Sequence, residues 1–188
     1  SCIGVFLIQN KVRIIGGEWR SRVITFPDSP DLRPTPDRVR ETLFNWLGQD
    51  LSGKTCLDLF AGSGVLGFEA ASRWAARVVM VESDPRILKA LHASLQKLET
   101  KRIELVAMDA LKFIASDWRP FDVIFLDPPY RLELLPKLLP LLPPHLAKDG
   151  LVYIEGENLS RPAAGWQVWR SGRAGTVCYQ LLKLETNG

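Results

Sequence analysis

The residues Asp58-Leu59-Phe60-Ala61-Gly62-Ser63-Gly64-Val65-Leu66-Gly67 join a predicted strand at 55–60 to a predicted helix at 65–75. Their glycines match the GxGxxG pattern of a nucleotide-binding loop, and this context of a preceding strand and a following helix is the one that the pattern requires. Glycines at such a junction permit a tight turn and let a ligand approach the backbone closely. Taken alone, the loop fits NAD as well as S-adenosylmethionine (SAM).

The chain after this loop continues to alternate strands and helices. Further strands are expected at 78–82, 103–108, 123–126 and 151–154, and further helices at 85–99, 110–116 and 131–142. Short apolar strands separated by helices predict an α/β fold with a parallel sheet covered on both faces. The last part differs, because 166–170 and 176–185 flank the turn-forming run 171–175. We expect these two strands to pair antiparallel, with the second inside the sheet.

The chain before the loop predicts a small β element and a linker. Strands at 12–15 and 23–26 flank a glycine-containing turn, and three prolines then make an extended segment. A helix is expected over 36–47, with Thr35 as its cap and Pro36 in the first helical position. We therefore divide the chain into an extension at 11–35 and a main domain at 36–188.

Composition excludes several classes of protein. The chain has 188 residues and is 46% hydrophobic, which is enough for a packed core and too much for a disordered chain. It lacks an apolar run long enough to cross a membrane, and residues 1–10 make a poor signal peptide. Three cysteines (Cys2, Cys56 and Cys178), far apart in the chain, favour a reducing, cytoplasmic location. With two histidines, a His-rich metal centre and a His-based triad are both excluded, so no metal is expected.

Three acidic residues lie at or after the ends of strands, and the position of Asp58 helps to separate SAM from NAD. Asp58 precedes the glycines, where a carboxylate suits the ammonium of a methionine moiety better than a pyrophosphate. Glu82 ends the next strand, 20 residues after Gly62, where an acid can hold ribose hydroxyls. Asp109 follows the third strand and either accepts a hydrogen bond from an adenine amino group or caps the next helix.

The fourth strand runs directly into Asp127-Pro128-Pro129-Tyr130. Parallel strands present their sites at their carboxyl ends, and two prolines make the turn stiff and leave carbonyl groups free. Asp127 and the Pro128 carbonyl can accept hydrogen bonds from an exocyclic amine while Tyr130 stacks on its ring. Because the lone pair of such an amine is delocalised, holding it in position is the main catalytic contribution expected.

These motifs, with the segments 13–22 and 32–47, resemble the bacterial 16S rRNA (guanine(966)-N2)-methyltransferase family of class I SAM-dependent enzymes. The resemblance runs from about residue 12 to 185. It implies a Rossmann-like, seven-stranded, mostly parallel sheet with one reversed strand near the C-terminus, beside the N-terminal hairpin. The apolar start, 1–10, departs from the polar start typical of the family.

The resemblance also assigns roles to individual residues. Gly62, Ser63 and Gly64 would line the SAM loop, while Glu82 would hold the ribose and Asp109 the adenine. Asp127 and Tyr130 would hold the target guanine. Thr35 and Arg38 would lie beside the methionine end of SAM.

The charge distribution gives the chain ends a possible role in RNA binding. The net charge is +3, and segments 11–40 and 161–188 are basic whereas 41–160 is acidic. Arg13, Arg20 and Arg22, with Lys11, could contact phosphates, and Trp19 could either stack on an unpaired base or hold the hairpin together. Arg161, Arg170 and Arg173 are weaker candidates. We expect a monomer that recognises 16S rRNA within an assembled or partly assembled small subunit, with no membrane partner.

Three other functions fit parts of the sequence. An NAD-dependent oxidoreductase would explain the glycine loop but would leave the 127–130 motif without a role. A non-catalytic RNA-binding assembly factor would keep the basic ends but would not need an intact SAM loop. An adenine-N6 DNA methyltransferase shares the 127–130 motif, yet the chain has no evident domain for recognising a DNA duplex.

Overall fold

The computed structural model describes residues 9–157, 159 and 162–186, and its centre is a seven-stranded sheet in the order β5-β4-β3-β6-β7-β9-β8. Within it, β9 is antiparallel to both neighbours and the other pairs are parallel. This confirms the predicted fold class and the interior position of the last strand. The strands are β3 (Thr55–Asp58), β4 (Arg77–Glu82), β5 (Ile103–Ala107), β6 (Phe121–Phe125), β7 (Leu146–Glu157), β8 (Trp166–Ala174) and β9 (Val177–Leu184).

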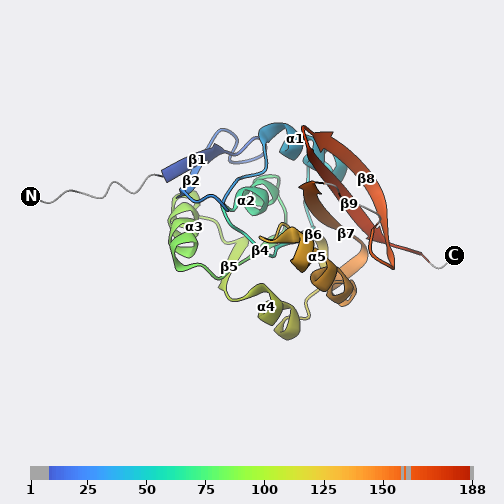
Figure 1. Cartoon of the computed structure of the whole chain (residues 1–188). Helices are drawn as coiled ribbons and strands as arrows, with labels where there is room; N and C mark the ends of the chain where they lie inside the picture. The colour runs from blue at the N-terminus through green and yellow to red at the C-terminus, as the bar shows by residue number, and fades with distance from the viewer. Residues whose placement is uncertain (1–8, 158, 160–161, 187–188) are drawn as a thin grey trace, which may run out of the picture.

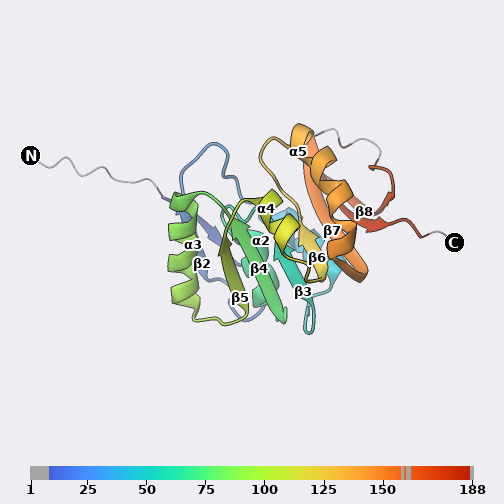
Figure 2. The ribbon, with the colours of Figure 1, turned by 90° about the horizontal axis from the view of Figure 1, so that it is seen from below.

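Helices cover both faces of the sheet, as Figures 1 and 2 show. One apolar core joins the sheet to α1 (Asp37–Leu47), α2 (Val65–Ser72) and α3 (Pro85–Leu98). A second core joins it to α4 (Ala110–Ser116) and α5 (Arg131–Leu138), which short 3-10 turns at 139–141 and 143–145 follow. None of the described helices is long and apolar enough to span a membrane.

The N-terminal hairpin packs on the same core as α1, α2 and α3. It consists of β1 (Gln9–Arg13) and β2 (Val23–Pro27), and β2 lies against α3 (Figure 1). One face of the hairpin is buried in this core. The first strand ends at Arg13, whereas the sequence predicted that it would reach Ile15. The Ile15 N–H donates to Glu69 Oε2 of α2 over 3.0 Å instead of pairing with β2.

A buried ionic network fastens this hairpin and the linker to the helices. The side chains of Arg40 in α1 and Glu69 in α2 are fully buried, with Arg40 Nη1 3.6 Å from Glu69 Oε2. Arg40 also donates to the carbonyls of Arg13 and Thr35, over 2.8 and 3.0 Å. Arg73 adds a second cation, 3.0 Å from Glu69 Oε1. The extension is thus tied to the main fold by charge as well as by apolar packing.

Two local predictions were wrong in detail. Thr35 does not cap α1: Pro36 is the N-cap residue, and the Thr35 hydroxyl donates instead to Glu155 of β7 over 3.2 Å. The final turn is also shorter than the expected 171–175 loop. Pairing with β9 carries β8 on to Ala174, which lies opposite Val177, so Gly175 and Thr176 alone connect the strands.

The two cysteines within the described part of the chain, Cys56 and Cys178, are buried free thiols. Burial raises the pKa of the Cys56 thiol to about 12. Cys2 and Arg161, both named above, lie outside the described residues.

Candidate active site

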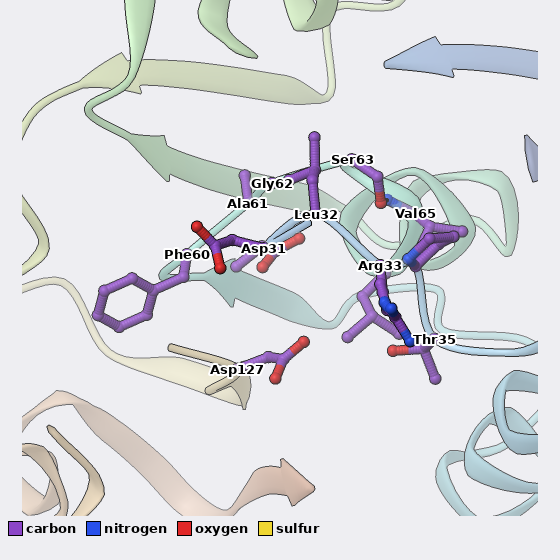
Figure 3. Close-up of a pocket in the computed structure, with 13 residues that line it drawn as sticks. Asp31, Leu32, Arg33, Thr35, Phe60, Ala61, Gly62, Ser63, Val65 and Asp127 are labelled. Carbon is purple, nitrogen blue, oxygen red and sulfur yellow. The ribbon is translucent and has the colours of Figure 1, made fainter. Parts of the chain in front are cut away.

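A pocket opens where the chain leaves β3, between the glycine loop and the proline-containing linker (Figure 3). Strands β3 and β6 are neighbours in the sheet, but the chain continues from β3 to β4 on one side and from β6 to β7 on the other. Open α/β sheets bind ligands at the carboxyl ends of two such strands. Asp127, just after β6, lies at the lower end of the pocket in this view. The pocket is lined by Asp31, Leu32, Arg33, Pro34, Thr35, Asp58, Phe60, Ala61, Gly62, Ser63, Val65, Leu66 and Asp127.

The glycine loop turns sharply at two of its glycines. Gly62 and Gly64 have φ of 54° and 82°, a region that other residues rarely adopt. A Cβ at Gly64 would lie 2.5 Å from the Phe68 ring and 2.7 Å from Leu91, so this position has no room for a side chain. Of the three predicted loop contacts, Gly62 and Ser63 line the pocket, whereas Gly64 is the N-cap of α2 and shapes the turn.

Glu82 supports the loop from the end of β4. Its Oε1 accepts from the Gly62 N–H over 3.0 Å, and its Oε2 accepts from Ser83 and Asp84 over 2.9 and 3.0 Å. A carboxylate offers about four acceptor sites, so these bonds leave capacity for a further donor. Glu82 therefore lies beside the loop, as its spacing predicted, although it does not line the pocket.

Asp58 is almost completely buried beneath the loop. Its Oδ2 accepts from the Gly67 N–H over 3.1 Å, at the start of α2. Burial raises the pKa of Asp58 well above its ordinary value; the Gly67 hydrogen bond opposes the shift, and the charges of Asp127 and Glu82 add to it. A cation bound in the pocket would favour the ionised form of this carboxyl group.

Asp109 occupies one of the two roles considered for it. It is the N-cap of α4, where its Oδ2 accepts from the Lys112 N–H over 3.2 Å. It is exposed and is not part of the pocket lining. Contact with an adenine amino group stays a prediction.

Asp127, Pro128 and Tyr130 form the turn between β6 and α5. Asp127 faces the pocket, and its Oδ1 lies 3.6 Å from Arg131 Nε. Burial and the charge of Glu155 raise the pKa of Asp127 to about 7, while Arg131 opposes the shift. Pro128 is buried, whereas Tyr130 is 77% exposed with φ of 53°. The turn thus presents a carboxyl group inside the pocket and an accessible aromatic ring outside it.

The linker contributes different residues from those predicted. Thr35 is buried and lines the pocket, as expected. Arg38 is exposed on α1 and is not part of the lining, whereas Arg33 is. Arg38 lies in the first turn of α1, past the end of the linker segment 31–35 that lines the pocket.

Glu155 is a residue of this site that sequence reasoning missed. It is buried near the end of β7, where its Oε2 accepts hydrogen bonds from Tyr153 and Thr35. The signal that could have identified it is its position directly after the strand expected at 151–154, because the carboxyl ends of parallel strands carry the sites of such sheets.

The predicted RNA contacts separate into two groups. Arg13, Arg20 and Arg22 are exposed, and Arg22 also donates to the Lys97 carbonyl over 3.0 Å. Trp19 is only 5% exposed, and the Arg102 guanidinium lies 5.4 Å from its ring centroid. The expectation that Trp19 stacks on a base is therefore wrong, because its ring is part of the core beneath the hairpin.

Comparisons with known proteins place the chain in a family. Residues 12–183 match the family model described as Conserved hypothetical protein 95. The chain is 43% identical to ribosomal RNA small subunit methyltransferase D of Escherichia coli K12, over 96% of this chain and 93% of that protein. The Haemophilus influenzae protein of the same name is 40% identical, over 93% and 95%.

Solved structures agree with the sequence matches. The protein yhhF of Escherichia coli superposes with a TM-score of 0.85 at 41% identity, covering 94% of this chain and 99% of that one. The family model extends from the end of β1 over the glycine loop and the 127–130 motif. The chain belongs to the family described as Conserved hypothetical protein 95, together with the ribosomal RNA small subunit methyltransferase D proteins that its motifs resemble.

Proposed function

We propose that this protein transfers a methyl group from SAM to the exocyclic N2 amino group of a guanine in 16S rRNA. The observation that carries the proposal is that Asp127 and the glycine loop line one pocket. The names of its relatives, ribosomal RNA small subunit methyltransferase D, support the substrate class.

The residues present fit SAM. The loop exposes backbone at Gly62 and Ser63 to the pocket, Asp58 supplies a buried carboxyl group for an ammonium, and Glu82 lies beside the loop where ribose hydroxyls would be. Asp109 would accept from the adenine amino group, and Thr35, which lines the pocket, would lie beside the methionine end. SAM supplies an electrophilic methyl group when bound.

The turn after β6 would hold the target base. The Asp127 carboxyl and the Pro128 carbonyl would accept the two N–H bonds of the amine, which orients its lone pair toward the methyl group. The accessible Tyr130 ring would stack on the base. Acceptor groups placed in advance also stabilise the positive charge that develops on the amine.

The hairpin supplies a basic surface for the RNA. Lys11 and Arg13 point to the exposed face of β1, opposite the buried Val12. Contacts with phosphate would position the RNA without reading its sequence. We propose that the protein acts in the cytoplasm as a monomer, on an assembled or partly assembled small subunit whose preformed surface compensates for the modest charge of +3.

The direct test is an assay with SAM carrying a labelled methyl group, on small subunits from cells lacking this enzyme. Label is expected in a single guanine, and mass mapping should place it on N2. Asp127→Asn should reduce the rate by at least about 100-fold, because it removes a charged acceptor that contacts the reacting amine. The exposed Asp149→Asn serves as the charge-matched control. Absence of label in guanine would reject the proposal, and label in DNA adenine would favour the alternative enzyme.

The RNA surface has its own test. Lys11→Glu combined with Arg13→Glu should weaken binding to the subunit and reduce its salt dependence, since about two phosphate contacts are lost. Lys148→Glu, an exposed change at the start of β7, is the control. If assembled subunits and protein-free rRNA were methylated with equal efficiency, the proposal that the substrate is an assembled or partly assembled subunit would be rejected.

A further inference from the structure

Glu155 lies next to Asp127 because of the strand register. In the parallel pair β6–β7, Phe125 is opposite Tyr153. Glu155, two residues further along β7, points to the face of the sheet that carries Tyr153 and Phe125. Asp127, two residues beyond the end of β6, lines the same pocket as Thr35, whose hydroxyl donates to Glu155. The same face packs against α1 and the linker. Two carboxyl groups are therefore brought together at the carboxyl ends of adjacent strands.

The orientation of Glu155 is fixed by two hydroxyl groups. Its Oε2 accepts from the Tyr153 hydroxyl over 2.6 Å and from the Thr35 hydroxyl over 3.2 Å. The Tyr153 ring is itself packed edge-on against Phe125, with centroids 6.4 Å apart. Glu155 is 8% exposed, and Tyr153 is fully buried. Burial of a carboxyl group lowers stability unless the group is hydrogen-bonded, and these two hydroxyl groups supply such bonds.

The surrounding charges leave Glu155 as the main negative neighbour of Asp127. Burial comes first and the charge of Glu155 second among the causes that raise the pKa of Asp127 to about 7. Arg131 on α5 acts in the opposite direction from 3.6 Å. The other titratable groups around the pair are Asp58 below the glycine loop, Arg33 on the linker, and Tyr153 and Tyr179 on β7 and β9.

We propose that Glu155 is a positioning residue: it fixes the Asp127 carboxyl group and supplies the negative charge that makes Asp127 the acceptor of the proton released by the target amine. This inference rests on the proposed function. As the bond between nitrogen and the methyl carbon forms, the bond between that carbon and sulfur breaks, and sulfur keeps the electron pair. One N–H proton then passes to the ionised Asp127, which leaves a neutral methylated amine.

A raised proton affinity is useful for this step. An isolated aspartate is a weak base, and general bases work best when their pKa is near the working pH. The like charge of Glu155 moves Asp127 toward that range. Activity should therefore rise with pH through an apparent pKa near 7, as Asp127 becomes ionised.

The test is Glu155→Gln, which removes the charge but keeps an oxygen that can accept from Tyr153 and Thr35. The rising limb of the kcat profile should move to lower pH by about one unit or more, and the plateau should fall about tenfold, since Asp127 becomes a weaker base. The KM for SAM should not change. Glu157→Gln, at the next position on the same face of β7, is exposed and should behave as wild type.

A second readout does not depend on methyl transfer. The carbon-13 resonance of the Asp127 carboxyl group, assigned with Asp127→Asn, should titrate near pH 7 in the wild type and at lower pH in Glu155→Gln. This experiment needs neither RNA nor SAM, so failure of the proposed function would leave it intact. An unchanged Asp127 titration in a folded Glu155→Gln protein would overturn the inference even if guanine methylation is demonstrated.

If the Glu155→Gln protein does not fold, the Tyr153→Phe variant tests the same positioning role. It removes one hydrogen bond to Glu155 and keeps the ring that packs on Phe125. The kcat plateau should fall about fivefold, the equivalent of one ordinary hydrogen bond, with the KM for SAM unchanged. An unchanged kcat here would overturn the positioning role.

Discussion

Glu82 Oε1 accepts a hydrogen bond from the backbone N–H of Gly62 over 3.0 Å, and so the end of β4 holds the loop that follows β3. The second oxygen accepts from the N–H groups of Ser83 and Asp84, which lead into α3. One side chain thus fixes the glycine loop and the start of the next helix relative to each other. The pocket wall formed by Gly62 depends on this carboxylate.

Glu82→Gln should weaken binding of S-adenosylhomocysteine at least about tenfold and lower the free energy of unfolding by about 1–3 kcal/mol. Glutamine has one acceptor oxygen and places an NH₂ group against backbone N–H donors. Calorimetric titration and urea denaturation measure the two effects. Glu41→Gln, on the exposed side of α1, is the control. Unchanged affinity would show that the loop does not need this support.

Asp58→Asn should stabilise the protein increasingly as pH rises. Burial raises the pKa of folded Asp58 above 3.8, the ordinary value that the unfolded chain retains. Ionisation therefore favours the unfolded state, and the wild type loses stability between the unfolded and the folded pKa. Asparagine does not ionise, and its amide oxygen can still accept from Gly67. The gain should therefore be larger at pH 8 than at pH 5.

Urea denaturation at pH 5 and pH 8 checks this difference, with Asp149→Asn as an exposed control. Affinity for S-adenosylhomocysteine should fall in Asp58→Asn, because a neutral amide cannot pair with an ammonium. A wild type that is the more stable protein at pH 8 would show that the carboxylate is compensated in the absence of ligand.

Trp19→Ala should lower the free energy of unfolding by about 3–5 kcal/mol, because a buried aromatic side chain leaves a cavity. Arg102 also loses the ring over which it lies. The neighbouring Arg20→Ala removes an exposed side chain and should change stability by less than about 0.5 kcal/mol. Thermal and urea unfolding distinguish the two. Wild-type stability combined with a loss of RNA affinity would restore the base-stacking interpretation of Trp19.

Arg40→Ala should lower the free energy of unfolding by about 3–5 kcal/mol, since it breaks a buried ion pair with Glu69. The carbonyls of Arg13 and Thr35 lose a donor at the same time. Amide exchange should therefore accelerate in the hairpin more than in the central strands. The exposed Glu41→Ala, on the same helix, is the control. Uniform acceleration across the molecule would mean that the network stabilises the whole fold rather than the attachment of the hairpin.

Most of the fold can be predicted from local sequence patterns, each formed by residues that lie close together in the chain. Alternating apolar strands and helices predicted the parallel sheet, and the two-sided apolar pattern of 176–185 predicted the interior position of β9. The resemblance to the methyltransferase family supplied the number of strands. Boundaries were less exact, as β7 extends over Leu146–Glu157 rather than 151–154. Strand ends depend on pairing with neighbours, which no local pattern records.

Glycine spacing and the 127–130 motif were sufficient to locate the pocket, because parallel strands bring the residues at their carboxyl ends to one edge. Long-range packing governed the details that local patterns got wrong or missed. Thr35 had the right chemistry for a helix cap, but its hydroxyl meets Glu155, 120 residues away. Of the two roles considered for Trp19, the structure shows the packing role, and Arg38 is exposed, since burial depends on what covers a side chain. The proximity of Glu155 to Asp127 required tertiary structure, because adjacent strands β6 and β7 bring both residues to the pocket that Thr35 lines.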